Sequence, residues 1–352
     1  MKKLKTENAN ETEGCLLTII VPSYKTAPYI DMCLPTFINN ELKKKIKVLL
    51  IDDGTPDKET KEKLIFFAKT YPDFFEFIHK GNGGHGSVIN LGAALSQSKY
   101  FKVIDGDDWV NTKELVNLVR FLQSCIDDIV FSDFSYIYTD HKVFVSGAND
   151  HSTNFYVGKN IDSIENFTIV FHNETIKTSL WKNNGIAVRE NVFYDDQEYC
   201  LYPLEYAKTV AYCPGDVYQY RIGEEGQSVS PASRGKHFED LVKINDDLYD
   251  LYLRNLATKP FLSKNVAKAI TNNFFGFLIS AMYTKGDSRM EKIKKKDEVG
   301  KWYRLIVQDP ILYAELDRKR SLFKTAKALH FKHFRLMRSL FEIRQKYIEV
   351  KK

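Results

Sequence analysis

The chain has 352 residues, of which 43% are hydrophobic and 28% are charged, and its formal net charge is +5. This composition is ordinary for a soluble globular protein, and the length predicts one large domain or two of average size. The five cysteines are widely spaced and form no Cys-x-x-Cys pair, which argues against a zinc site and a disulfide scaffold and for reduced, intracellular thiols.

The first half of the chain alternates predicted strands with predicted helices. Residues 1–14 are polar, and we expect a flexible tail without the apolar segment of a secretory signal. Uninterrupted apolar runs then predict buried strands at 16–21, 46–51, 75–79, 101–105 and 129–131. Helices are expected between them at 29–39, 57–70, 87–97 and 111–124. This alternation predicts a mostly parallel central sheet covered on both faces.

Polar segments follow the first four strands at the points where the strands end. They are Pro22-Ser23-Tyr24, Asp52-Asp53-Gly54, the glycine-rich loop 81–86, and residues 105–108. In open parallel sheets, ligands bind in the crevice beyond the carboxyl ends of the strands. We therefore expect these four segments to converge on one crevice.

The strand at 101–105 ends in three carboxylates within four residues, Asp105, Asp107 and Asp108. Like charges that crowd together have no evident stabilising role, but a divalent cation such as Mg²⁺ prefers oxygen ligands and shares them with substrate phosphates. In an extended segment, Asp105 and Asp107 point to the same side, so Asp107 would hold the ion directly and Asp105 through water. A solvated Asp-Gly-Asp turn is the alternative interpretation.

The second half of the chain changes from mixed structure to helices. Residues 134–158 predict short strands and turns, and 163–170 a helix. A second acidic cluster, Asp195-Asp196, opens a predicted helix to residue 206, where acids also suit the helix dipole. Strands at 210–212 and 217–220 and a loop at 223–235 follow, and then helices at 236–256, 261–284, 290–307 and 310–347. We expect one domain at 15–235 and a helical region at 236–352.

Residues 318–352 form a basic tail, with twelve Lys and Arg against two Asp and Glu. Apolar and basic residues alternate in it at helical spacing, which favours contact with an anionic membrane surface. Packing on the catalytic domain and an oligomer interface are the alternatives. Nucleic-acid binding is not expected, because no recognition motif accompanies the charge. The longest apolar run of the C-terminal half, Phe274 to Tyr283, is about half as long as a membrane-spanning helix. We expect a cytoplasmic protein, peripheral at most on the inner face of the membrane.

The glycine-rich loop suggests a competing function. Gly81, Gly83 and Gly86 match the G-x-G-x-x-G fingerprint of NAD(P)-binding Rossmann enzymes, and Asp105 follows 19 residues later. Two features argue against this alternative. The fingerprint normally sits on the first strand of its fold, and its acidic residue is single rather than part of a triplet.

Together, the motifs resemble family 2 glycosyltransferases of the GT-A fold over about residues 15–230. The matching segments are Ile20-Val21-Pro22-Ser23-Tyr24, Leu50-Ile51-Asp52-Asp53-Gly54-Thr55, Asn82 with Asn90-Leu91-Gly92-Ala93, Lys102-Val103-Ile104-Asp105-Gly106-Asp107-Asp108 and Asp195-Asp196-Gln197-Glu198-Tyr199. The resemblance implies a Rossmann-like nucleotide-sugar-binding domain and an inverting transfer of a sugar from a nucleotide diphospho-sugar, with UDP favoured. The acceptor would be a hydroxyl of a glycan, a lipid-linked sugar or a cell-envelope polymer.

The resemblance also implies roles for individual residues. The nucleotide pocket would be lined by Pro22, Ser23 and Tyr24, and Asp53 would accept a hydrogen bond from the base. The corner 105–108 would contact the ribose through Gly106 and hold Mn²⁺ or Mg²⁺ on the diphosphate through Asp107. Asp196 corresponds to the catalytic base.

Two departures from the family pattern stand out. Asp195 replaces the usual Glu before the base, and an arginine near the glycine-rich loop is missing, with His85 or Lys80 as its substitute. Arg221 is a candidate phosphate partner, with a surface ion pair as the alternative, and Trp109 packs either on a sugar or in the core. A nucleotide-sugar-binding protein without catalysis is a further alternative, against which the intact Asp107 and Asp196 argue.

Overall fold

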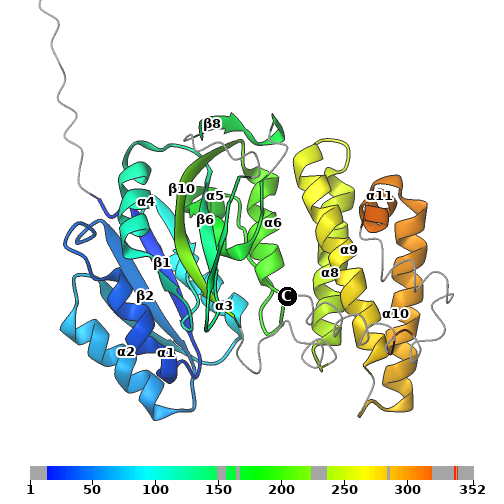
Figure 1. Cartoon of the computed structure of the whole chain (residues 1–352), viewed down its shortest axis with the longest axis horizontal. Helices are drawn as coiled ribbons and strands as arrows, with labels where there is room; N and C mark the ends of the chain where they lie inside the picture. The colour runs from blue at the N-terminus through cyan, green and yellow to red at the C-terminus, as the bar shows by residue number, and fades with distance from the viewer. Residues whose placement is uncertain are drawn as a thin grey trace, which may run out of the picture.

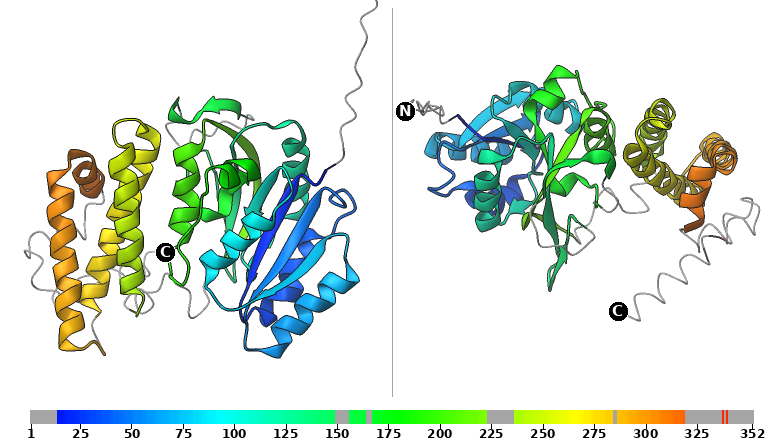
Figure 2. Two further views of the ribbon diagram at one scale, coloured as in Figure 1. Left: turned by 180° about the vertical axis from the view of Figure 1, so that it is seen from behind. Right: turned by 90° about the horizontal axis from the view of Figure 1, so that it is seen from above.

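The computed structural model describes residues 14–148, 156–163, 167–222, 236–283, 286–318, 337 and 339. A sheet covered by helices lies beside a group of helices from the C-terminal part of the chain (Figures 1 and 2). Three expectations fall outside the described residues: the N-terminal tail up to residue 13, the loop at 223–235, and almost all of the basic tail at 318–352.

The first half of the sheet is parallel, as the alternation of strands and helices predicts. Its strands are β1 (Leu17–Ser23), β2 (Ile46–Asp53), β3 (Phe75–Lys80) and β4 (Tyr100–Val103), in the order β3-β2-β1-β4. Nearly all residues of β1, β2 and β4 are buried, as expected for strands covered on both faces. The chain crosses from one side of β1 to the other between β3 and β4, which opens a crevice at the carboxyl end of β1.

The other half of the sheet is mixed in direction. It continues from β4 in the order β9-β6-β10-β5, with β7 paired to β6 and β8 paired to β10. The strands are β5 (Trp109–Val110), β6 (Ile129–Ile137), β7 (Lys142–Val145), β8 (Tyr156–Asn160), β9 (Glu174–Lys177) and β10 (Thr209–Arg221). β9 is antiparallel to both β4 and β6, so it separates two strands that a regular alternating fold would place side by side.

The sheet domain contains the following helices, two of which are capped at their N-terminus by the side chain of the preceding residue. They are α1 (Ala27–Cys33), α2 (Lys58–Thr70), α3 (His85–Leu95), α4 (Thr112–Ser124), α5 (Thr178–Asn183) and α6 (Asp196–Tyr206). The Asp57 side chain accepts from Thr60 N at 2.7 Å, and that of Asn111 accepts from Glu114 N. The expected helix at 29–39 is shorter, because α1 passes at Leu34 into the 3-10 turn Leu34–Phe37.

In the second half of this domain two expectations are wrong, and one strand was not expected. The predicted helix at 163–170 is absent from the described residues, where Phe167 instead forms a bridge with Ala148. The strands expected at 210–212 and 217–220 are one strand, β10, with an irregularity between Cys213 and Asp216. β9 was not predicted at all.

The C-terminal region is helical, as predicted, in the part that the structure describes. Its helices are α8 (Phe238–Asn255), α9 (Pro260–Met282), α10 (Arg289–Gln308) and α11 (Pro310–Arg318). α9 packs on α8, α10 and α11, while α6 of the sheet domain lies against α8 and α9 (Figure 1). None of the described helices combines the length and the hydropathy that crossing a membrane requires.

Candidate active site

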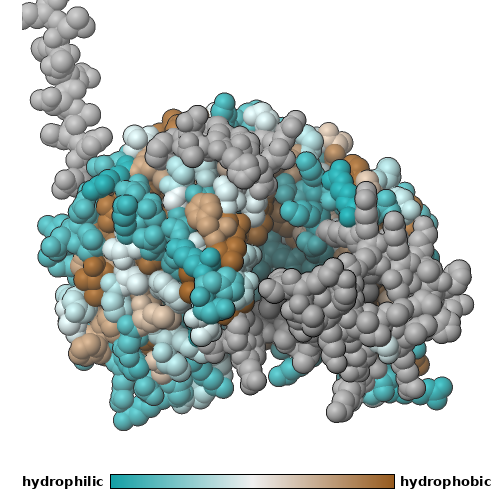
Figure 3. Space-filling view, viewed as in Figure 1, coloured by the Kyte–Doolittle hydropathy of each residue, from teal (hydrophilic) through white to brown (hydrophobic). Residues whose placement is uncertain are grey.

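A deep cleft with a volume of about 2030 Å³ lies at the carboxyl ends of β1, β2 and β4. Figure 3 shows the surface hollowed between the sheet domain and the C-terminal helices. All four segments that the sequence predicted to converge contribute to the lining, as does the start of α6. The predicted site residues in the lining are Pro22, Ser23, Tyr24, Asp53, His85, Asp105, Gly106, Asp107 and Asp196.

The acidic corner, residues 105–108, is held in place by its neighbours on both sides. The Tyr218 hydroxyl on β10 donates to Asp108 Oδ2 at 2.6 Å and accepts from the Asp105 backbone N–H at 3.2 Å. Gly106 lies against the end of β1, where a Cβ atom would come within 2.6 Å of the Pro22 carbonyl oxygen. Contacts with β10 and with the end of β1 therefore fix the conformation of the corner.

The corner fits a divalent cation. Carboxylate oxygens of Asp105, Asp107 and Asp108 lie within 4.8 Å of one another. Burial and the Asp105 charge raise the pKa of Asp107, and burial and both neighbours raise that of Asp108 well above its usual value, as expected when like charges crowd. Both oxygens of Asp108 accept hydrogen bonds, from Tyr218 and from Arg221 N. Asp107 and Asp105 thus face the cleft and could hold an ion there.

Arg221 lies beside the corner, outside the residues that line the cleft. Its Nε donates to the Asp107 carbonyl at 3.1 Å, its Nη2 is 3.6 Å from Asp107 Oδ2, and its guanidinium lies 3.7 Å from the centroid of the Tyr29 ring. The side chain is only 14% exposed, so this is not a surface ion pair. Trp109 also lies outside the lining, in β5, where it pairs with Gln219.

The Asp53 carboxylate holds the glycine-rich loop. Its two oxygens accept hydrogen bonds from the backbone N–H groups of Gly83 and Gly84, both at 2.9 Å, and Lys80 Nζ donates to it at 2.6 Å. Lys80 also bonds the Gly81 carbonyl and the Ser87 hydroxyl. The ammonium group of Lys80 is therefore engaged within the loop and is not the cation that replaces the family's arginine.

These contacts also argue against the nicotinamide alternative. In a dinucleotide fingerprint, the loop amides and the following helix N-terminus bind the pyrophosphate. Here Asp53 already occupies the amides of Gly83 and Gly84. Gly86, in turn, packs against the Arg189 carbonyl, and a Cβ atom there would overlap it. Gly86 therefore serves close packing against the 189–195 loop, whereas the space beside Gly81 is open.

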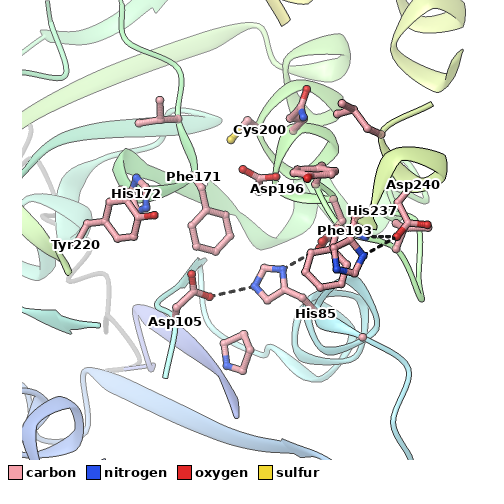
Figure 4. A pocket seen from close by; sticks show the side chains of 18 of the residues that line it. His85, Asp105, Phe171, His172, Phe193, Asp196, Cys200, Tyr220, His237 and Asp240 are labelled. Atoms are coloured by element: carbon pink, nitrogen blue, oxygen red, sulfur yellow. Dashed lines mark hydrogen bonds and ion pairs between the residues drawn. The ribbon is translucent and has the colours of Figure 1, made fainter. Parts of the chain in front are cut away.

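His85 bridges the acidic corner and the start of α6. Its Nε2 lies 3.1 Å from Asp105 Oδ1 and its Nδ1 lies 2.8 Å from Asp195 Oδ2 (Figure 4). Burial alone would lower the pKa of His85, but the two carboxylates outweigh it and raise the pKa well above its usual value. His85 is therefore the candidate for the positive charge next to the glycine-rich loop. Asp195 is buried and serves this contact instead of capping α6.

Asp196 is the first residue of α6 and opens into the cleft between the sheet and the C-terminal helices. The Asp196 side chain is exposed to the cleft, yet partial desolvation by the cleft walls, with the nearby Asp195 charge, raises the pKa of Asp196 to about 6. Near neutral pH the carboxylate is then mostly ionised and yet basic enough to accept a proton. Asp195 and Asp105 both contact the His85 ring. This ring therefore joins the acidic corner to the residue that precedes Asp196.

The loop before α6, residues 189–195, contacts α8. Arg189 Nε and Nη2 bind Asp247 Oδ2 at 2.6 and 2.5 Å. The Phe193 ring stacks on His237 with a centroid distance of 3.4 Å, next to Asp240 (Figure 4). No local sequence pattern indicates these contacts, because they join residues far apart in the chain. The C-terminal region thus helps to position the residues at the start of α6.

Comparison with known proteins identifies the family. Residues 18–182 match the protein-family model for glycosyl transferase family 2. This part of the chain is a glycosyltransferase family 2 domain. The matched residues run from β1 to α5, so they contain the whole acidic corner and the glycine-rich loop.

Two curated relatives show how far the similarity extends for this family 2 glycosyltransferase. The uncharacterized glycosyltransferase EpsJ of Bacillus subtilis is 32% identical over 133 residues, which cover 37% of this chain and 37% of EpsJ. The minor teichoic acid biosynthesis protein GgaB of the same organism is 22% identical over 275 residues, or 72% of this chain and 30% of GgaB. The matches thus span well under half of either relative's own length.

Solved structures share the fold over nearly the whole chain. The crystal structure of residues 1–349 of Staphylococcus aureus TarS superposes with a TM-score of 0.61 and 15% identity, covering 93% of this chain and 91% of that chain. At this identity the comparison supports the GT-A architecture followed by helices, and the chemistry has to be argued from the residues themselves.

Proposed function

We propose that the protein is an inverting glycosyltransferase that moves a sugar from a nucleotide diphospho-sugar to a hydroxyl of a cell-envelope polymer or related glycan. The observation that carries the proposal is the shared cleft of the acidic corner and Asp196, with His85 between them. A UDP-sugar is the favoured donor, because one of the TarS structures that share this fold is a complex with UDP-GlcNAc. An envelope polymer is the favoured acceptor, because GgaB is named for teichoic acid biosynthesis.

The donor would lie along the carboxyl ends of β1 and β4. The base and ribose face Pro22, Ser23, Tyr24 and Gly106, with Asp53 at the far end, and the diphosphate faces Asp105 and Asp107. When bound there, Mn²⁺ or Mg²⁺ would offset the negative charge that the leaving diphosphate gains. Arg221 would be a further partner of the diphosphate, whose oxygens suit a guanidinium, by way of the corner where it pairs with Asp107.

Asp196 would act as the general base. Its carboxylate takes the proton of the acceptor hydroxyl while the hydroxyl oxygen attacks the anomeric carbon. The bond from that carbon to the diphosphate breaks, and the nucleoside diphosphate leaves with the electron pair. Attack from the face opposite the leaving group inverts the anomeric configuration, by analogy with inverting glycosidases.

A donor-hydrolysis screen tests this function without knowledge of the acceptor. The protein is incubated with UDP-, GDP- and dTDP-sugars in the presence of Mn²⁺, and the released nucleotide is measured. We expect release from at least one UDP-sugar and its loss when EDTA removes the metal. Failure to bind or hydrolyse any of these donors would refute the proposed function.

Almost all of the basic tail at 318–352 lies outside the described residues, and its role rests on the sequence. We propose that it attaches the enzyme to anionic membrane, because its basic residues each add roughly 1 kcal/mol near such a surface. The full chain should sediment with phosphatidylglycerol-containing vesicles and a chain ending at residue 317 should not. Equal sedimentation of both forms would refute this role.

A further inference from the structure

Aromatic rings line the part of the cleft where the transferred sugar would lie. In the proposed reaction the anomeric carbon lies between the diphosphate, at the acidic corner, and the base Asp196. The cleft lining also includes Phe171, His172 and Tyr220 (Figure 4). Burial raises the pKa of the Tyr220 hydroxyl, and the charges of the corner and of Asp196 raise it further, so this hydroxyl lies close to both. These rings are therefore placed to contact the sugar.

The His172 ring is held between aromatic neighbours. It stacks on the Tyr220 ring with a centroid distance of 4.1 Å, and it meets the Tyr218 ring edge to face at 4.7 Å. The His172 backbone carbonyl accepts a hydrogen bond from Nζ of the buried Lys102 at 2.8 Å. Tyr218 is also the residue whose hydroxyl bonds the acidic corner. The position of the imidazole is therefore fixed relative to the diphosphate site before any ligand binds.

His172 retains hydrogen-bonding capacity that the surrounding protein does not use. Its Nδ1 is buried and has no partner among the described residues, which leaves Nε2 as the ring nitrogen that a ligand can reach. Burial and the Lys102 charge outweigh the Asp105 charge and lower the pKa of His172 to about 3. Near neutral pH the imidazole is therefore uncharged, with one N–H donor and one acceptor nitrogen. Such a group suits a sugar hydroxyl, which also donates and accepts.

We infer that His172 selects the sugar that is transferred, through a hydrogen bond between its imidazole and one hydroxyl of the donor's sugar ring. This inference rests on the proposed function and names the residue that reads the sugar. Phe171 and Tyr220 add the apolar surface that pockets for small ligands combine with a few polar groups. A site that pairs its polar group with a substrate hydroxyl disfavours analogues in which that hydroxyl is missing or displaced, because its own group then stays unpaired.

Two substitutions at His172 separate sugar recognition from packing. His172→Gln keeps an uncharged donor and acceptor but loses the stacked ring, whereas His172→Phe keeps a ring and loses both nitrogens. We would measure kcat/KM for each sugar of the donor-hydrolysis screen, including UDP-glucose, UDP-galactose and UDP-N-acetylglucosamine, and the Kd for UDP, all with Mn²⁺. His172→Phe should lower kcat/KM for the preferred sugar about tenfold and reduce its preference over the next sugar by a similar factor. His172→Gln should retain more of both, and neither variant should change the Kd for UDP.

His141→Phe is the matched control, because His141 also stacks on a tyrosine, Tyr138, but is exposed and does not line the cleft. It should leave the preference among sugars unchanged. Equal losses of kcat/KM for all sugars in His172→Phe, or a His172→Gln variant that performs no better than His172→Phe, would overturn the inference. The proposed function would still stand in either case, because the wild-type protein hydrolyses a donor. A wild-type protein that hydrolyses no donor would instead refute the proposed function itself.

Discussion

The acidic corner and the 189–195 loop face the same cleft, but different parts of the chain hold them. The corner follows β4 directly and is fixed by its sheet neighbours, through the Tyr218 hydroxyl and the close approach of Gly106 to β1. The 189–195 loop is held from both sides: Asp195 contacts His85 and the Asn191 N–H donates to the Gly83 carbonyl of the sheet domain, while Arg189 and Phe193 contact the C-terminal helical region. Two of its residues, Asn191 and Tyr194, have positive φ angles. Strained backbone of this kind persists only where surrounding contacts enforce it.

This difference separates two parts of the proposed reaction. Donor binding depends on the corner, and so on the sheet domain alone. Proton transfer depends on the position of Asp196, and so on the contact between the sheet domain and the C-terminal helices. Substitutions at the two regions should therefore change different measured quantities, and the following predictions test that separation.

The largest effect is expected for Asp196→Asn. The amide cannot accept the hydroxyl proton, so donor turnover should fall by about 10² to 10⁴. The Kd for UDP with Mn²⁺ should stay within about twofold of the wild-type value, because the corner is untouched. Turnover and isothermal titration measure the two quantities. Asp250→Asn on the exposed side of α8 is the control, and near-normal turnover of Asp196→Asn would refute the assignment of the base.

Asp107→Ala should chiefly affect donor binding. Loss of the cleft-facing ligand should raise the Kd for UDP in the presence of Mn²⁺ about 10- to 100-fold, and the residual binding should no longer respond to EDTA. Asp162→Ala, which removes an exposed carboxylate away from the cleft, should behave like wild type. If Asp107→Ala retained metal-dependent binding, the cation would have to lie elsewhere.

The pH profile of turnover should have an acidic limb near pH 6. Desolvation by the cleft walls raises the pKa of Asp196 to about 6, and a general base works only when deprotonated, so activity is present above this pKa and lost as the pH falls through it. At pH 5 turnover should be about tenfold lower than at pH 7. A flat profile down to pH 5 would contradict Asp196 as the titrating base.

The smallest effect is expected for Arg189→Ala, which breaks the contact with Asp247. Turnover should fall about 3- to 10-fold, because a displaced base loses alignment, while the Kd for UDP stays unchanged. Arg254→Ala is the matched control: Arg254 joins α8 to Glu205 at the other end of α6, far along the helix from Asp196. Equal losses of turnover in the two variants would show that the effect is not specific to the loop.

The sequence predicted the corner better than the loop for a physical reason. Strands that end at Ser23, Asp53 and Val103 must meet at one edge of a parallel sheet, so local apolar runs were enough to bring Ser23, Asp53 and Asp105 together. The bridge from His85 to Asp195 joins residues 110 positions apart, and the pair Arg189–Asp247 joins residues 58 positions apart. No local pattern records such partners.

The errors in the fold have similar causes. β9 is only four residues long and contains a single strongly apolar residue, Ile176, so its burial comes from insertion between β4 and β6. The sequence predicts two strands in place of β10, because Pro214 and Gly215 interrupt the apolar pattern. In the structure these residues form an irregularity within one continuous strand. In both cases tertiary contacts override a weak local signal.

The stereochemistry of donor hydrolysis tests the central claim most directly. With an α-linked UDP-sugar and water as the acceptor, proton NMR in D₂O identifies the first sugar anomer before mutarotation. A base at Asp196 on the face opposite the leaving diphosphate predicts that the β-anomer forms first. Initial release of the α-anomer would contradict a single displacement across this cleft.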